Sequence, residues 1–128
     1  MLQQLRRRAS DALSAPRRVA LATYGPADIQ VESLSCEAVG LCLYVLVPQT
    51  SDLLFNLENH TLVVATSDAW QARGFARLLS PTDCPEQLTI TKTTEATWCQ
   101  VAEIHPTRLD LGFAGGLRET IDLTQGPT

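Results

Sequence analysis

The chain has 128 residues, of which 45% are hydrophobic and 19% are charged, and its formal net charge is −4 at pH 7. This length predicts one domain with one core, and the hydrophobic fraction excludes a disordered chain. No apolar run reaches the roughly 20 residues that cross a bilayer, and the N-terminus lacks the apolar stretch of a secretory signal. We therefore expect a cytoplasmic protein with no membrane contact.

The first 18 residues form a basic segment with five arginines and one acid, whereas the rest of the chain is acidic. Leucine and alanine recur at helical spacing over residues 2–13, which predicts a short amphipathic helix that ends before Pro16. We expect residues 1–16 to form an N-terminal helical arm. No aromatic stacking residues accompany the arginines, so we do not expect nucleic acid as a partner.

Three strands are predicted in the next part of the chain. "RRVALATYG" reads as a strand that a Gly-Pro turn ends. "DIQVES" alternates, with Ile29 and Val31 on one face and Gln30 and Glu32 on the other, which predicts a half-buried strand. "GLCLYVLV" is almost wholly apolar, which predicts a strand that is covered on both faces.

The second half of the chain predicts a helix and further strands. "SDLLFNLEN" predicts a helix between the third and fourth strands, and "TLVVAT" and "WQARGFARLL" predict the next two strands. Gly74 in the latter indicates a bulge or a close backbone approach. "SPTDCPEQ" predicts a turn or short helix, and the remaining strands are predicted at "LTITKTT", "TWCQVAEIHP", "TRLDLGF" and "RETIDLT". The fold class is therefore mainly β: six to eight antiparallel strands with a few short helices, arranged as a barrel or a sandwich rather than as a parallel α/β sheet.

The cysteines and histidines show no metal-ligand spacing. There is no CxxC pair, and His60 and His105 are isolated in the sequence, so we predict no metal site. Cys36 and Cys42 flank a presumed turn at "EAVG" and could become cross-strand neighbours. In a reducing compartment we expect the thiols to stay free. No nucleotide-binding loop or catalytic triad spacing is present either, so any chemistry would come from a cofactor.

Several segments match a known family in their order and spacing. In chain order they are "VALATYG", "GPADIQVES", "GLCLYVLV", "SDLLFNLENHTLVVAT", "WQARGFARLL" and "IHPTRLDL". From about Arg17 to Leu123 the chain resembles the FMN-binding split-barrel family related to pyridoxamine 5′-phosphate oxidase. The resemblance implies a split β-barrel over residues 17–124, followed by a tail at 125–128. It also implies a homodimer that holds FMN at its interface and acts as a small flavin-dependent oxidoreductase.

The resemblance assigns cofactor contacts by position and identifies no catalytic residue. The family's phosphate-binding lysine falls on Leu53, so the phosphate contact passes to arginines, whose guanidinium group binds phosphate through two donors. The complete set of implied cofactor contacts is Arg17, Arg18, Thr23, Ser33, Ser51, Asn56, Trp70 and Arg73.

Two alternatives remain open at this stage. A barrel without the phosphate lysine could be a non-catalytic binding or dimerisation module that has lost FMN or binds heme or a deazaflavin. Single residues also have structural alternatives: Trp70 could pack in the core or at a dimer contact, and Asn56 could fix the turn after its helix by bonding local backbone. Arg118 could cover the mouth of the groove or form a surface ion pair.

Overall fold

The computed structural model describes residues 2–112 and 118–124, so the expected tail lies outside the described residues. These residues form two α-helices, seven strands and three 3₁₀ turns. The helices are α1 (Leu2–Ser14) and α2 (Asp52–Asn59), and the 3₁₀ turns are η1 (Pro81–Asp83), η2 (Ile90–Lys92) and η3 (Glu95–Trp98). The strands are β1 (Arg18–Thr23), β2 (Gln30–Val39), β3 (Cys42–Pro48), β4 (Leu62–Thr66), β5 (Trp70–Leu79), β6 (Cys99–Gly112) and β7 (Arg118–Asp122).

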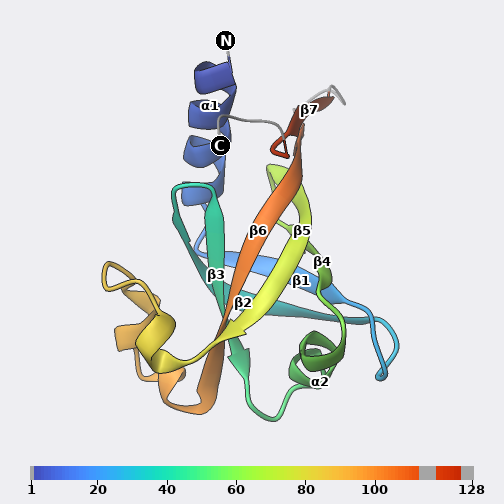
Figure 1. The fold of residues 1–128 in the computed structure, drawn as a ribbon, viewed down its shortest axis with the longest axis vertical. Coiled ribbons are helices and arrows are strands. Elements are labelled where there is room, and N and C mark those ends of the chain that lie inside the picture. The colour runs from blue at the N-terminus through green and yellow to red at the C-terminus, as the bar shows by residue number, and fades with distance from the viewer. Residues whose placement is uncertain (1, 113–117, 125–128) are drawn as a thin grey trace.

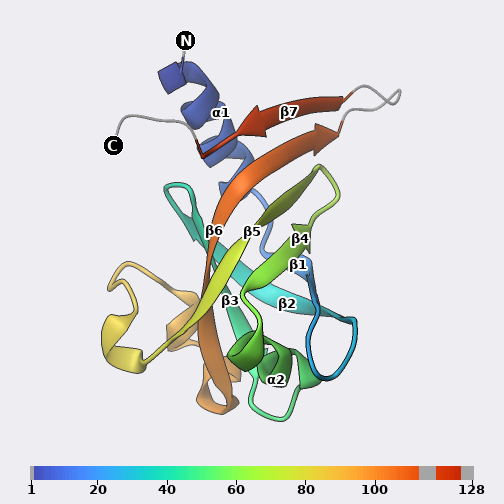
Figure 2. The ribbon, with the colours of Figure 1, turned by 45° about the vertical axis from the view of Figure 1, so that its right-hand side comes forward.

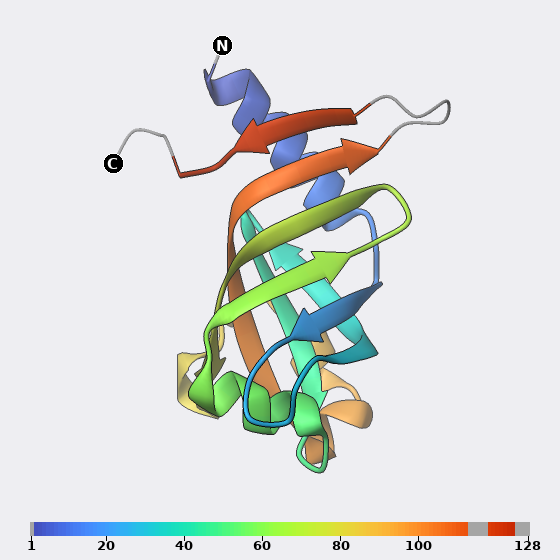
Figure 3. The ribbon, with the colours of Figure 1, turned by 90° about the vertical axis from the view of Figure 1, so that its right-hand side faces the viewer.

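The strands form an antiparallel barrel, as predicted. Their order is β3-β2-β1-β4-β5-β6-β7, and a further pairing between β3 and β6 closes the first six strands on themselves. The seventh strand, β7, continues the sheet from the far end of β6 (Figure 3). Closure removes the free edges from the six-stranded part of the sheet.

The two helices lie at opposite ends of the barrel (Figures 1 and 2). The helix α1 packs on the barrel through Ala9 and Leu13, both fully buried. Its Arg8 also binds Glu119 of β7 through two hydrogen bonds of 2.6 Å. Within the described part of the chain, no helix is long and apolar enough to cross a membrane.

The strand β3 is buried on both faces, as its apolar run predicts. Leu43, Val45 and Val47 face the main core inside the barrel. Tyr44 and Leu46 face outward into a second core, which the segment 80–98 covers with Leu88 and neighbouring residues. The prediction of a strand at 88–94 is wrong, because this segment forms 3₁₀ turns over the second core and the Glu37 carboxylate accepts hydrogen bonds from its backbone.

At the start of β2 the apolar side chains are exposed and the polar side chains are half-buried, the reverse of the usual pattern. Ile29 and Val31 are 68% and 58% exposed, while Gln30 and Glu32 are half-buried. The register pairs Ala22 of β1 with Val31, which places this apolar side chain on the outside of the barrel. Cys36 and Cys42 are not cross-strand neighbours, because their partners are Val45 and Val39, and both thiols are free.

The strand β6 is one long strand where two were predicted. The prediction ended a strand at Pro106, but Pro106 lies inside β6 and faces Gly74 of β5 at a shift in register. This bulge accommodates a residue that has no N–H to donate to the sheet. A side chain on Gly74 would place its Cβ 2.2 Å from the His105 carbonyl oxygen. The predicted bulge and close backbone approach at Gly74 are thereby confirmed.

Candidate functional site

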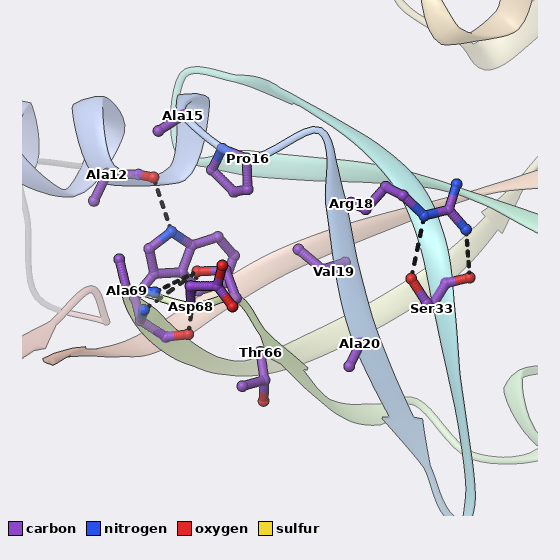
Figure 4. Close-up of a pocket in the computed structure, with 12 residues that line it drawn as sticks. Ala12, Ala15, Pro16, Arg18, Val19, Ala20, Ser33, Thr66, Asp68 and Ala69 are labelled. Atoms are coloured by element: carbon purple, nitrogen blue, oxygen red, sulfur yellow. Dashed lines mark hydrogen bonds between the residues drawn. The ribbon is translucent and has the colours of Figure 1, made fainter.

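A cavity of about 670 Å³ lies between the C-terminal end of α1, strands β1 and β2, and the loop that joins β4 to β5 (Figure 4). Three of the residues that the resemblance assigned to the cofactor line it together: Arg18, Ser33 and Trp70. Its volume falls within the range of roughly 300–1,000 Å³ that is typical of small-molecule sites. The full lining is Ala12, Ala15, Pro16, Arg18, Val19, Ala20, Ser33, Thr66, Ser67, Asp68, Ala69 and Trp70.

Arg18 is the cation of this cavity. It begins β1, and its guanidinium group lies along β2, where Nε donates to Ser33 Oγ at 3.2 Å (Figure 4). Nη1 donates to Ser35 Oγ at 3.1 Å. Nη2 donates to the Ser33 carbonyl oxygen at 2.9 Å. These three bonds fix the side chain, while it stays exposed and keeps further N–H groups for a ligand. Asp68 is the acid on the opposite part of the lining.

The outer surface of β1 forms a flat floor beside Arg18. Ala20 has Ser33 of β2 and Thr66 of β4 as its cross-strand partners, and Ala22 has Val31 and Val64. The two alanines project only methyl groups between larger neighbours. A planar ring system could lie flat against such a surface.

Trp70 forms part of the cavity wall and of the core. It is 3% exposed, belongs to the main core cluster, and its indole Nε1 donates to the Ala12 carbonyl oxygen at 2.8 Å (Figure 4). The indole therefore attaches α1 to the barrel, which agrees with the alternative of a core contact. Its position in the wall also leaves it at the edge of the cavity.

Asn56 and Thr23 lie together, away from the cavity. Asn56 is fully buried; its Nδ2 donates to Thr23 Oγ1 at 3.0 Å and to the Asp28 carbonyl oxygen at 2.8 Å, and its Oδ1 accepts from Ala27 N at 2.9 Å. The expectation of bonding to local backbone is wrong, because these partners come from the end of β1 and the loop that follows it. Asn56 thus fixes that loop against α2.

The N-terminus of α2 carries negative rather than positive charge. Ser51 is its N-cap and accepts from Leu53 N at 3.0 Å, and the same hydroxyl donates to the Glu32 carboxylate. Asp52 occupies the first turn. Leu53, where the resemblance places the lysine, is fully buried in the main core. Two carboxylates at this corner oppose the binding of an anion.

The other assigned arginines lie outside the cavity. Arg17 is exposed and does not line it. Arg73 is exposed on β5, where Val64 is its cross-strand partner on one side and Arg108 on the other. Arg118 lines a smaller cavity of about 180 Å³ that shares the β4–β5 loop with the larger one.

Sequence reasoning missed the β4–β5 loop and the end of α1 as cavity walls. Ser67 Oγ accepts hydrogen bonds from Ala69 N and Trp70 N, both at 3.2 Å, and so shapes the loop. The polar stretch "TSDAW" between two apolar strands was the available signal, and it predicts only a turn. Within residues 2–112 and 118–124 no group of three or more His, Cys, Asp or Glu side chains could hold a metal ion.

No protein-family model and no curated protein matches the chain. Solved structures do match it. One is a Clostridium acetobutylicum protein related to general stress protein 26, of the pyridoxinephosphate oxidase family, with a TM-score of 0.69 and 9% identity over 97% of each chain. A heme-binding protein from Mycobacterium smegmatis has a TM-score of 0.67 and 12% identity, over 94% of this chain and 57% of that one.

A third similar structure is an F420 reductase, with a TM-score of 0.61 and 15% identity over 78% of this chain and 94% of that one. At such identities the likeness concerns the fold, and the three proteins differ in what their names say they bind or do. The closed six-stranded barrel, the added strand and the two end helices agree with it. The chain has the split-barrel fold of the pyridoxamine 5′-phosphate oxidase-like proteins.

Proposed function

We propose that this protein binds FMN at the cavity beside Arg18, as a homodimer, and acts as a small flavin-dependent oxidoreductase. The observation that carries the proposal is an anchored, exposed guanidinium group in a cavity that Ala20 also lines, at the start of a row of small side chains that continues along β1 to Ala22. An arginine binds phosphate through paired N–H donors, and the floor suits a planar ring. FMN combines both features and would supply hydride or single-electron chemistry.

The chain's own residues divide the work of binding between them. Arg18 would face the phosphate, with Ser33 and Ser35 holding its guanidinium group in place. Ala20 and Ala22 would lie under the ring, and the Ser33 and Thr66 hydroxyl groups flank that floor. Asp68 would favour a neutral or donor edge of the ligand on its side, because a second anionic group there would be repelled.

A second chain would complete the site. Apolar side chains continue outward from the floor, and the most exposed of them are Tyr24, Ile29, Val31 and Leu62, at 53–68% exposure. Monomeric proteins rarely expose such a contiguous group. A copy of the same chain packed on this surface would cover it and enclose the ligand from above.

The experiment is titration of the purified protein with FMN, followed by flavin fluorescence and by visible absorption. We expect Arg18→Gln to raise the Kd for FMN by about 10- to 100-fold, the equivalent of one charge-assisted phosphate contact. Arg17→Gln is the matched control, because its side chain is equally basic but does not line the cavity; its Kd should stay within about twofold. A protein that takes up no FMN, or an unchanged Kd in Arg18→Gln, would contradict the proposal.

The acidic corner at α2 favours a second candidate, a split barrel that binds a different ligand without turnover. Glu32 and Asp52 lie at the helix N-terminus beside Leu53, the position of the family's lysine, so a phosphate could not use that helix N-terminus. Heme and a deazaflavin are the ligands to compare, because similar folds include a heme-binding protein and an F420 reductase. Titration with hemin and with F420 under the same conditions would favour this candidate if either bound more tightly than FMN.

A further inference from the structure

A second group of reactive side chains lies on the outside of the barrel, where β3 and β6 run side by side (Figure 1). The register pairs Tyr44 with Glu103 and Leu43 with Ile104, which brings Cys42 at the start of β3 next to His105. None of these residues lines the cavity beside Arg18. The group is therefore separate from the proposed cofactor site.

Hydrogen bonds connect a thiol, an imidazole and a carboxylate in a row. Cys42 Sγ lies 3.4 Å from His105 Nδ1, and His105 Nε2 lies 2.6 Å from Glu103 Oε1. An ionised carboxylate only accepts, so Nε2 carries the proton and Nδ1 of the neutral ring presents its lone pair to the thiol. This is the arrangement in which an imidazole can remove the proton of a nucleophile.

Glu103 is held in place on its other sides. Tyr44 OH donates to Oε2 at 2.8 Å, and Arg77 Nε donates to Oε1 at 2.8 Å. The Glu103 side chain is only 9% exposed, whereas that of His105 is 55% exposed. The carboxylate is thus a fixed, buried support for a ring that is open to solvent, and Cys42 beside it is half-buried.

The other thiols have different surroundings. The Sγ atoms of Cys36 and Cys84 donate to backbone carbonyl oxygens, those of Pro16 at 3.4 Å and Ser80 at 3.6 Å. Cys36 is also 3% exposed. A carbonyl oxygen cannot take up the proton of a thiol at neutral pH, so these contacts do not activate the sulfur.

Charges around Cys42 show why the imidazole is needed. Burial raises the pKa of the Cys42 thiol, the negative charge of Glu103 raises it further, and Arg77 lowers it. The thiol is therefore protonated at neutral pH and needs a base before it can attack. The titratable or charged groups that face the thiol are Tyr44 on β3, Arg77 on β5, and Glu103 and His105 on β6. Farther out, Asp83 interacts with Arg77, and Cys84 interacts with Glu103.

We propose that Cys42 is a modification site for small disulfides, with His105 as its general base and Glu103 as the residue that positions His105. The thiol proton passes to Nδ1 while the sulfur attacks one sulfur of the disulfide. The S–S bond of the reagent breaks, a mixed disulfide forms on Cys42, and the departing thiolate takes the proton from Nδ1. The disulfide is the only oxidant required.

The surroundings of Cys42 also select the class of disulfide. The His105 side chain is 55% exposed and Cys42 is half-buried, so the reagent can approach from open solvent. The Arg77 guanidinium group is 66% exposed beside them and would attract a carboxylate. A small disulfide that carries carboxylate groups, of which glutathione disulfide is the convenient probe, fits both conditions.

The test incubates the native protein with glutathione disulfide and maps the modified cysteine by peptide mass spectrometry over time. At pH 7 we expect the adduct on Cys42 to form about tenfold faster than on Cys84 or Cys99, which are also half-buried. A rate on Cys42 no higher than on those two thiols would overturn the proposal. Because the native chain is used, this result does not depend on the folding of any variant.

Variants then separate general-base catalysis from simple exposure. His105→Gln should slow the reaction at pH 7 by about tenfold or more, and the rate should rise only at higher pH than in the native protein. Glu103→Gln should slow the reaction by a smaller factor, since Gln can still hold the ring, and it should shift the pH profile to lower pH, because the negative charge that raises the pKa of the Cys42 thiol is removed. His60→Gln is the control and should leave rate and profile unchanged. An unchanged profile in His105→Gln would exclude His105 as the base.

Discussion

Asn56 shows how one buried amide can organise a loop. Its three hydrogen bonds reach Thr23, Ala27 and Asp28, and its Oδ1 would lie 2.8 Å from a Cβ added to Gly25. The loop between β1 and β2 therefore closes around this side chain. Since Thr23 and Ala27 N are satisfied here by the amide, its removal would leave buried polar groups without partners.

We predict that Asn56→Ala lowers the free energy of unfolding by about 2–4 kcal/mol, because each unsatisfied buried partner costs roughly 1–3 kcal/mol. Asn59→Ala is the matched control on the same helix: its side chain is exposed and donates only to the Phe55 carbonyl oxygen. Its effect should stay within about 0.5 kcal/mol. Urea unfolding followed by circular dichroism measures both. Equal losses in the two variants would contradict the assigned role.

Glu103 contributes stability that depends on pH. Burial alone would raise its pKa, but hydrogen bonds from Tyr44, Arg77 and His105 outweigh burial and lower the pKa to about 2. A glutamate in the unfolded chain has a pKa of about 4.3. The folded pKa is the lower one, so this stabilisation, roughly 3 kcal/mol, is complete above about pH 4.3 and is lost as the pH falls towards 2.

We expect the native protein to lose stability steeply between about pH 4.5 and pH 2, and Glu103→Gln to be less stable at pH 7 and flatter over that range. Glu58→Gln is the control, because Glu58 is exposed on α2 and, among the described residues, its carboxylate forms no hydrogen bond or ion pair. Thermal unfolding at several pH values measures the difference. If the unfolding temperature of Glu103→Gln fell with decreasing pH as steeply as that of the native protein, the stabilising role of Glu103 would be refuted.

At the scale of elements, the close approach of the paired strands β5 and β6 depends on the absence of a side chain at Gly74. A Cβ at Gly74 would lie 2.2 Å from the His105 oxygen and 2.8 Å from Pro106 Cα, both backbone atoms that cannot rotate away. Gly112 has room for one, its nearest neighbour being the Ala69 oxygen at 3.5 Å. This close contact lies at the register shift where Gly74 faces Pro106 of β6.

Gly74→Ala should therefore destabilise the protein by about 1–3 kcal/mol, the range for an overpacked site, while Gly112→Ala should change stability by less than about 1 kcal/mol. Denaturant midpoints of the two variants give the comparison. Similar midpoints would mean that the two strands can separate at Gly74 without cost.

The sequence predicted the elements whose pattern is local. The apolar run at 40–47 identified β3, and Gly74 identified the bulge. It failed where tertiary contacts decide. Pro106 lies inside β6 at a bulge, where β6 has one extra residue, Thr107, opposite the step from Arg73 to Gly74. Leu88 belongs to a covering segment because Tyr44 and Leu46 need burial. In the site, the resemblance indicated Arg18, but the cavity walls at 66–69 form only when the β4–β5 loop meets α1.

At the scale of the whole molecule, the exposed apolar surface around β1 and β2 has to be explained. Tyr24, Ile29 and Val31 are 58–68% exposed, although the barrel interior is filled and the second core is covered by the segment 80–98. The polar side chains of β2, Gln30 and Glu32, point to the other side. These exposed apolar side chains do not stabilise a single chain, but their burial between two chains would stabilise a dimer.

We predict that the protein sediments as a dimer and that Val31→Asp converts it to a folded monomer, because an unpaired carboxylate would be buried in the interface. Val31→Thr is the matched control: it keeps the β-branched shape and the strand, and it should remain dimeric. Analytical ultracentrifugation gives the mass, and circular dichroism shows whether each variant is folded. If the site beside Arg18 needs the second chain, Val31→Asp should also weaken FMN binding while Val31→Thr should not. A native monomer, or a Val31→Asp protein that remains dimeric, would show that this surface is not the interface.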